Sequence, residues 1–278
     1  MTSHPSGAEL MQHDVPTPAV TIFFLLTFAI TWGIVSGYIL FPETTADVFG
    51  ELQGAHPLFF VATWGPAISG VIMIVRHSGI GGLRRFLSRI FLWRAPLMWW
   101  LLIIIGFPLI FMAGSAFKGG PLLAPTPEEG VGTFFVIMVI MLFLGPIEEF
   151  GWRGVAQPLL QRLISPFWAG AVIGMIWGVW HLPAFHLSGV VFADWDFTTF
   201  FIGSAALGIL VTPIFNDARG SLLLPMLFHW QLIIPFWPDA QPWDTWIIVV
   251  LTAIVVWIRR KDMFSRDGAV TEVVPVRA

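Results

Sequence analysis

Long apolar stretches separated by short polar segments dominate this chain of 278 residues. A helix needs about 20 mostly apolar residues to cross the hydrocarbon core of a bilayer. We therefore predict an all-α fold, a polytopic membrane bundle of about eight transmembrane helices. The stretches that meet or approach the required length are Ala19–Leu40, Pro57–Val75, Leu97–Phe117, Val131–Gly151, Pro166–Phe185, Phe197–Phe215, Ser221–Trp237 and Trp243–Ile258.

The composition supports this class of protein. Hydrophobic residues make up 56% of the chain and charged residues only 11%, whereas a soluble domain carries about 25% charged residues. A soluble fold of this length needs more polar side chains to cover its surface. The net charge of -3 gives no sign of nucleic-acid binding, and the absence of cysteine excludes disulfides and cysteine-based sites.

The basic residues predict the orientation. All of the 14 Lys and Arg residues except Lys118 fall on one side of the eight-span layout. By the positive-inside rule, both termini are cytoplasmic. We expect a short cytoplasmic N-terminal tail (1–18), one membrane domain (19–258) and a basic cytoplasmic C-terminal tail (259–278). The expected location is the inner (plasma) membrane of a prokaryote.

Two segments are candidates for amphipathic helices that lie at the membrane surface. Gly82–Arg94 combines four arginines with Leu, Phe, Ile and Trp at helical spacing, which suits the headgroup level. Val155–Ile164 is a weaker candidate. For both segments an ordinary charged connector is the alternative interpretation.

Three of the predicted spans carry the candidate set of five ionisable residues, inside them or just beyond them: Glu148, Glu149, Arg153, His181 and His229. Burying such a group in hydrocarbon costs about 3 kcal/mol on insertion scales. Their presence in an otherwise strongly apolar bundle therefore indicates a functional site at these residues.

The spacing of the acidic residues predicts how they divide. Glu149 and Arg153 stand at i and i+4 with the acid first, which favours a helical ion pair. Glu148 points about 100° away on the helix, so it is the freer carboxylate and the candidate general base. The alternatives are a purely stabilising Glu149–Arg153 pair and histidines that only form hydrogen bonds between helices.

These residues resemble the motifs of the CPBP intramembrane proteases, which include the CAAX prenyl endopeptidases and the bacterial Abi proteins. Residues 148–153 (EEFGWR) match the EExxxR motif. Trp177 and His181 match the second motif, an aromatic residue, three further residues and then histidine, with Trp at the position where the family usually has Phe. His229 matches the histidine of the third motif, although Ile233 replaces its asparagine or similar polar residue.

The resemblance covers roughly residues 131–237 and implies an intramembrane endopeptidase. It implies that Glu148 activates a water, that His181 helps to hold it, and that His229 stabilises the oxyanion. Glu149 and Arg153 complete the implied catalytic set. The expected partners are a membrane-associated protein or peptide substrate and the lipid bilayer, with no nucleic acid.

Ile233 removes one expected oxyanion donor, a change that costs about 10²–10³ in rate in other enzymes. Gln231 does not replace it, because on a regular helix it lies about 200° from His229. We expect Asn216, the only asparagine, to lie in a loop. The remaining options are His229 acting alone, a backbone N–H freed near Pro235, or a weak catalyst.

Glu148, His181 and His229 also match the donor set of a His₂Glu zinc site, but the chain has no HExxH motif. We favour a glutamate-activated water with no cofactor, and zinc is the alternative. Two other functions stay open: a non-catalytic membrane immunity or scaffold protein that retains the protease fold, and a small proton-coupled transporter.

Overall fold

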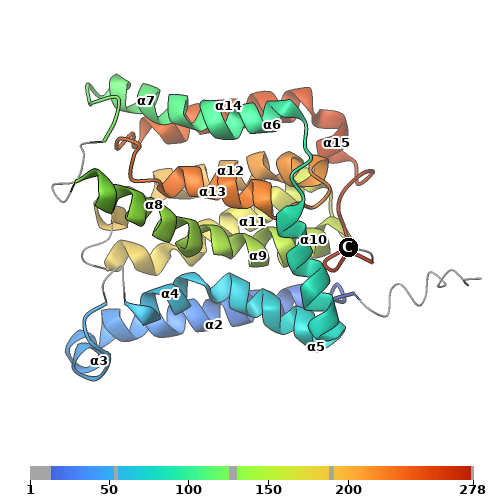
Figure 1. Cartoon of the computed structure of the whole chain (residues 1–278), viewed down its shortest axis with the longest axis horizontal. Coiled ribbons are helices and arrows are strands. Elements are labelled where there is room, and N and C mark those ends of the chain that lie inside the picture. Colours follow the sequence, from blue (N-terminus) through green and yellow to red (C-terminus); the bar gives the residue numbers. More distant parts are fainter. Residues whose placement is uncertain (1–13, 53–55, 125–129, 188–190, 277–278) are drawn as a thin grey trace, which may run out of the picture.

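The computed structural model describes residues 14–52, 56–124, 130–187 and 191–276, and every regular element in these ranges is helical (Figure 1). The all-α prediction is confirmed. Residues 1–13 of the predicted N-terminal tail lie outside the described residues. The α-helices are α2 (Ala19–Leu40), α3 (Pro42–Phe49), α4 (Pro57–Thr63), α5 (Gly65–Leu87), α6 (Leu97–Leu101), α7 (Phe107–Phe117), α8 (Val131–Leu144), α9 (Glu149–Gly151), α10 (Gln157–Gln161), α11 (Pro166–Trp180), α12 (Phe197–Asp217), α13 (Leu223–Ile233), α14 (Trp243–Ile258) and α15 (Arg260–Phe264).

The helices account for all the predicted spans. In the described residues, five helical runs are long and apolar enough to cross a membrane, and the pair α4 and α5, bent by 63°, makes a sixth if it is one span. The shorter apolar helices α13 and α14 stand where the last two spans were predicted. Large apolar side chains such as Ile104, Phe135 and Trp257 are exposed on the outer surface, as expected where helices face lipid. The chain is thus a polytopic membrane bundle.

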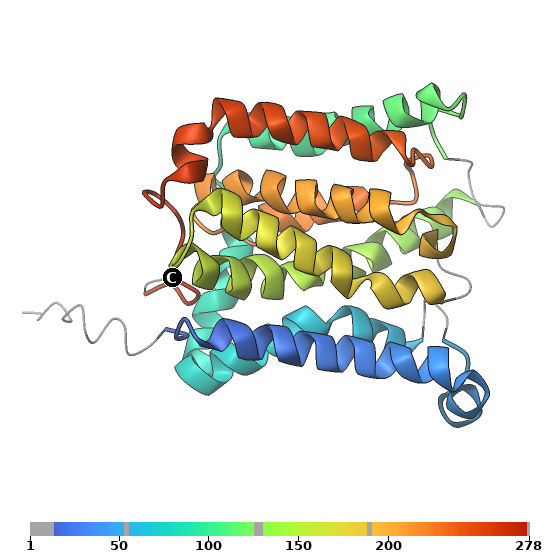
Figure 2. The same cartoon turned by 180° about the vertical axis from the view of Figure 1, so that it is seen from behind.

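Three tiers of helices build the bundle, and the front and back views agree on their order (Figures 1 and 2). The helices α8 to α13 form the middle tier. The helices α2, α4 and α5 lie on one side of it, and α6, α7 and α14 lie on the other. Within the middle tier α11 crosses α12 closely, since a Cβ on Gly208 would lie 2.5 Å from Gly174 Cα. Small residues allow such close backbone approach in membrane bundles.

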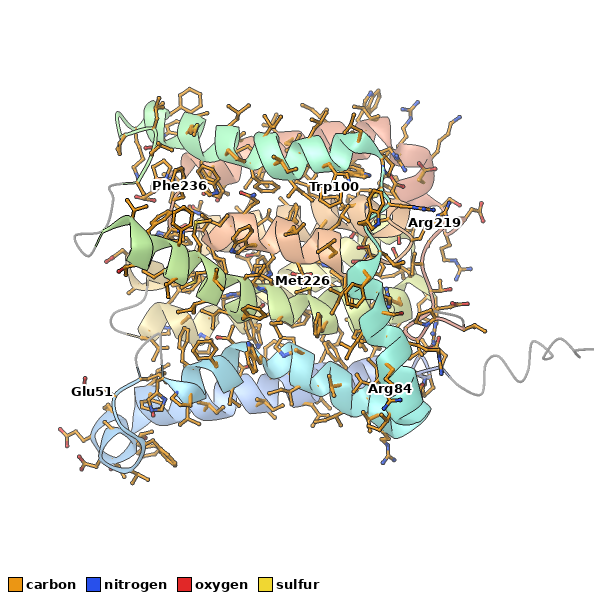
Figure 3. The ribbon with its side chains drawn as sticks, in the orientation of Figure 1. Glu51, Arg84, Trp100, Arg219, Met226 and Phe236 are labelled. Carbon is orange, nitrogen blue, oxygen red and sulfur yellow. The ribbon has the colours of Figure 1, made fainter. Side chains whose placement is uncertain are left out.

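The two ends of the bundle differ in charge (Figure 3). Arg84 and Arg219 lie at the end where the described parts of both termini emerge, and Glu51 and Phe236 lie at the opposite end. This arrangement agrees with the asymmetry used to predict the orientation. Which membrane face each end occupies remains a prediction.

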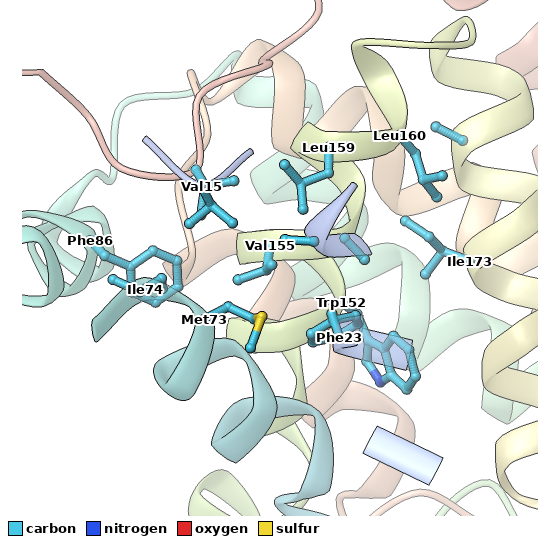
Figure 4. Packing of buried hydrophobic residues seen from close by; sticks show 14 of the residues in the cluster. Val15, Phe23, Met73, Ile74, Phe86, Trp152, Val155, Leu159, Leu160 and Ile173 are labelled. Atoms are coloured by element: carbon cyan, nitrogen blue, oxygen red, sulfur yellow. The ribbon is translucent and has the colours of Figure 1, made fainter. Parts of the chain in front are cut away.

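The weaker prediction of a surface helix at Val155–Ile164 was wrong. These residues continue the helical run Val131–Gln161. Val155 and Leu159 are fully buried beside Phe23 of α2 and Trp152, in the cluster that Figure 4 shows. The segment contains enough polar residues to suggest a surface position. It is buried because the first and last described segments of the chain pack over it.

The predicted surface helix Gly82–Arg94 is only partly confirmed. Helix α5 reaches Leu87 and a short 3₁₀ turn follows, with Arg84 and Arg94 exposed. Arg89, however, is buried and donates hydrogen bonds to three backbone carbonyls, those of Gly154, Gly220 and Val273. The physical reason is that the C-terminal segment folds back over this guanidinium and supplies one of the acceptors.

Candidate active site

The acidic motif lies in an irregular part of one helical run. A 3₁₀ turn (Pro146–Glu148) enters α9, and a wider π turn (Trp152–Ala156) leads on to α10. Such turns inside helices are frequent at functional sites. The run was expected to end at Gly151 but continues to Gln161, so the two glutamates lie within it rather than near its end. Glu148 and Glu149 are only 2% and 5% exposed.

Glu149 holds two basic side chains. Its Oε2 accepts a hydrogen bond from Arg153 Nε at 3.2 Å, and its Oε1 lies 2.8 Å from His229 Nδ1 on α13. The predicted i, i+4 ion pair with Arg153 is confirmed. Both oxygens of Glu149 are therefore engaged by basic groups, and this carboxylate ties α9 to α13.

Glu148 has a different environment. It forms no ion pair with any residue in the described ranges, as predicted for the freer carboxylate. Its Oε2 instead accepts two neutral indole N–H groups, from Trp177 Nε1 at 2.9 Å and from Trp152 Nε1 at 3.2 Å. Its Oε1 accepts no hydrogen bond from the part of the chain that the structure describes. Glu148 is thus held without being neutralised.

His181 follows the last residue of α11 and is partly exposed. Its Nδ1 lies 2.9 Å from the Trp177 carbonyl oxygen. A carbonyl oxygen only accepts, so Nδ1 carries the proton and Nε2 keeps its lone pair in the neutral ring. Trp177 packs edge-on against the rings of both His181 and His229, with centroid separations of 5.0 and 5.4 Å.

All five predicted site residues therefore belong to one connected cluster. Glu149, Arg153 and His229 are joined directly, and Glu148 and His181 join them through Trp177. The side chains come from the α9 region, from α11 with its C-terminal end, and from α13, so three predicted spans contribute.

The contacts of Trp152 and Trp177 with Glu148 were not predicted, although Trp177 was recognised as a motif residue. A buried indole N–H usually finds an acceptor, and Trp152 stands four residues after Glu148, at the spacing that revealed the Glu149–Arg153 pair. That signal was available for Trp152. For Trp177 the signal was weaker, since its partner lies on another helix.

A row of polar side chains continues the site along the helical run. Arg153 Nη1 donates to Gln157 Oε1 at 3.0 Å, and Gln161 exchanges hydrogen bonds with Asn216 at 2.8 and 3.0 Å. Asn216 was expected in a loop, but it belongs to α12 and also accepts from the Val270 N–H at 3.1 Å. The amide partners explain why a helix carrying glutamines stays buried here.

The side chain of Ile233 and that of His229 both lie beside Gly145. A Cβ on Gly145 would lie 2.9 Å from His229 Nε2 and also 2.9 Å from Ile233 Cδ1. Gln231 accepts a hydrogen bond from Trp237 Nε1 at 3.1 Å instead, which agrees with its predicted direction. The side of His229 that carries Nε2 therefore borders an aliphatic side chain where the motif has a polar one.

The proposed zinc ligands do not fit a metal ion in this arrangement. No three His, Asp or Glu side chains converge with metal-binding geometry in the described ranges. Within the candidate set, His229 Nδ1 is engaged by Glu149, and Glu148 Oε2 is engaged by two indoles. A three-ligand site at Glu148, His181 and His229 would require these contacts to rearrange.

The fold and the site define a class of protein, a multi-pass helical membrane protein with a largely buried Glu–Glu–Arg–His–His centre. Comparison with known families then gives the relationship. Residues 130–232 match the family model of the Rce1-like type II CAAX prenyl endopeptidases. The chain is also similar to CAAX prenyl protease 2 of Methanococcus maripaludis, with 23% identity over 89% of this chain and 96% of that protein.

These matches confirm the family resemblance that the motifs predicted. The matched range includes all five predicted site residues and Trp177. The relationship supports an intramembrane protease role for this membrane protein. It does not by itself assign the chemical role of any residue.

Proposed function

We propose that the protein is an endopeptidase that hydrolyses a peptide bond of a membrane-associated protein or peptide by means of a Glu148-activated water. One observation carries this proposal. Of two adjacent buried carboxylates, one is engaged by Arg153 and His229, while Glu148 is held by neutral donors on a single oxygen. Its other oxygen is the natural acceptor for a proton of water.

The proposed reaction uses the groups around Trp177. Glu148 takes a proton from the water, and the resulting hydroxide attacks the carbonyl carbon of the substrate. The Nε2 lone pair of His181 accepts a hydrogen bond from the same water and orients it. When the C–N bond breaks, Glu148 returns the proton to the leaving amine.

His229 is proposed as the oxyanion donor. Its Nδ1 is taken up by Glu149 at 2.8 Å, so Nε2 donates to an oxyanion only when the ring is the imidazolium. Glu149 is then its counter-ion, and Arg153 fixes Glu149 in place. Ile233 adds no donor, so we expect a slower reaction than in a site that carries the motif asparagine.

We propose that the reaction uses no bound metal, and the test is direct. Purified protein is analysed for metal content, and cleavage is measured before and after chelation. Activity that persists in metal-free protein supports the proposal. Stoichiometric zinc whose removal abolishes cleavage would overturn it.

The relative's name indicates a prenylated protein substrate for that protein. A prenylated peptide is therefore the first substrate to test here, beside a matched unprenylated membrane peptide. Cells carrying wild-type protein or the Glu148→Gln variant can then be compared by proteomics to find substrates that remain uncleaved.

The decisive variant is Glu148→Gln in proteoliposomes. The glutamine carbonyl still accepts the indole N–H groups, so the fold and site packing should persist, while the base is lost. We expect cleavage to fall to background with an unchanged melting temperature. A folded variant that cleaves at the wild-type rate would refute the proposed mechanism.

One alternative keeps support from a specific observation. Ile233 leaves the oxyanion position without the motif donor, which also suits a non-catalytic scaffold or immunity protein. If the Glu148→Gln variant fully complements the loss of the gene in cells, the scaffold function is favoured and the enzyme function fails.

A further inference from the structure

Two tryptophan side chains donate hydrogen bonds to the same carboxylate oxygen of Glu148. The indoles of Trp177 and Trp152 both donate to Oε2, at 2.9 and 3.2 Å. They are 8% and 1% exposed, and they come from separate elements, α11 and the π turn after α9. A carboxylate anchored from two elements has little freedom to rotate.

The anchoring makes the two oxygens of Glu148 unequal. Oε2 is saturated by two donors, so Oε1 is the oxygen left to accept a proton. Because indole N–H groups are neutral, they orient the carboxylate without the charge neutralisation that Arg153 gives Glu149. Hydrogen bonds to a charged group are stronger than those between neutral groups, so the two indoles favour one orientation of the carboxylate.

Trp177 also packs against both histidines. Its ring packs edge-on against His181 and His229 at interplanar angles of 86° and 74°. The same side chain therefore contacts the proposed base, the proposed water-orienting ring and the proposed oxyanion donor. Edge-to-face contacts of this kind have a preferred geometry.

From these contacts we infer that Trp177, with Trp152, is a positioning residue that holds Glu148 with Oε1 directed at the water. This inference rests on the proposed function. It is particular to this chain at position 177, because the motif usually carries Phe there and a phenyl ring has no N–H to donate.

The chain offers a matched control. Trp180 is also buried and lies edge-on to Trp152 at 5.9 Å and to His181 at 4.7 Å, but its Nε1 has no hydrogen-bond partner in the described residues. Replacing Trp by Phe at 177, 152 or 180 removes an indole N–H and keeps an aromatic ring. Only at 177 and 152 does the lost N–H contact Glu148.

The first experiment is steady-state cleavage of a membrane peptide in proteoliposomes. We expect Trp177→Phe to lower kcat at least about tenfold, the equivalent of one lost hydrogen bond to a charged group, with KM changed less than about twofold. Trp152→Phe should act in the same direction. Trp180→Phe should leave kcat within about twofold. If the Trp177→Phe and Trp180→Phe variants have equal kcat, the inference is wrong.

A second measurement needs no activity and separates the two proposals. In a double-mutant cycle, Trp177→Phe should lower the melting temperature less in the Glu148→Ala background than in the wild type. Equal decreases in both backgrounds would overturn the inference. If the coupling is present but the Glu148→Gln variant remains active, the tryptophans do position Glu148 and the proposed function fails instead. If Glu148→Gln abolishes cleavage and no coupling appears, only the inference about the tryptophans fails.

Discussion

Replacing Ile233 with asparagine should increase kcat, because it restores a polar donor at the motif position. Ile233 stands one helical turn after His229 on α13, so the two side chains share a face. Both His229 Nε2 and Ile233 Cδ1 lie 2.9 Å from the point where a Gly145 Cβ would stand. An amide at 233 therefore reaches the region that the imidazole borders.

The size of the gain follows from the chemistry of oxyanion donors. One well-placed donor is worth about 10²–10³ in kcat. This site is packed around an aliphatic side chain, so we expect only part of that gain, about tenfold. The loss of half-buried aliphatic surface costs about 1 kcal/mol of stability. The variant should therefore be faster and slightly less stable.

The assay compares wild type with Ile233→Asn and Ile233→Leu for peptide cleavage in proteoliposomes. Leucine has nearly the shape of asparagine but donates no hydrogen bond, so it isolates the amide. The gain should disappear when Glu148→Gln is added. If folded Ile233→Asn protein is no faster than Ile233→Leu protein, the oxyanion assignment is refuted.

Three further outcomes test the site and its setting. Gly145→Ala should lower kcat at least about tenfold, because the added methyl group displaces His229 Nε2. The variant should still fold, since the helical backbone at this position accepts alanine, and unchanged kinetics would contradict this reasoning. Arg153→Ala should lower the unfolding free energy by about 3–5 kcal/mol, because it leaves a buried carboxylate without its cation; denaturant or thermal unfolding in detergent measures this, and a change below about 1 kcal/mol would contradict it. The chain has no cysteine, so the variants Arg219→Cys and Glu51→Cys can each be labelled in intact cells with an impermeant maleimide. Only Glu51→Cys should react, and the reverse pattern would invert the predicted orientation.

The spans and the candidate site residues could be predicted from the sequence because charged residues are scarce in this chain. An ionisable group in an apolar run has to have a reason to be there, and that rule selected Glu148, Glu149, Arg153, His181 and His229. The i, i+4 spacing then predicted the Glu149–Arg153 pair, which the structure contains at 3.2 Å. Both inferences use only residues close together in the chain.

Contacts between distant residues were not readable in the same way. His229 pairs with Glu149 across 80 positions, and no local pattern shows which glutamate it meets. Arg89 was assigned to the headgroup region because a sequence window shows its charge but not the carbonyl of Val273 that covers it. The predicted span ended too early, at Gly151, because the polar residues that follow it gave no local sign that partners such as Asn216 of α12 bury them.

The two adjacent glutamates show how one short motif makes two different carboxylates. Neighbours on a helix point about 100° apart, so Glu149 meets the cation four residues on while Glu148 meets another helix. The ion pair of Glu149 with Arg153 and His229 keeps one charge compensated within the bundle. The indoles around Glu148 orient the second carboxylate without placing a cation in direct contact with it, in a low-dielectric interior where a charge acts strongly on its neighbours. In the proposed mechanism a water beside Glu148 meets the free oxygen of that carboxylate, and the two glutamates then have different tasks: Glu149 organises the site and Glu148 reacts.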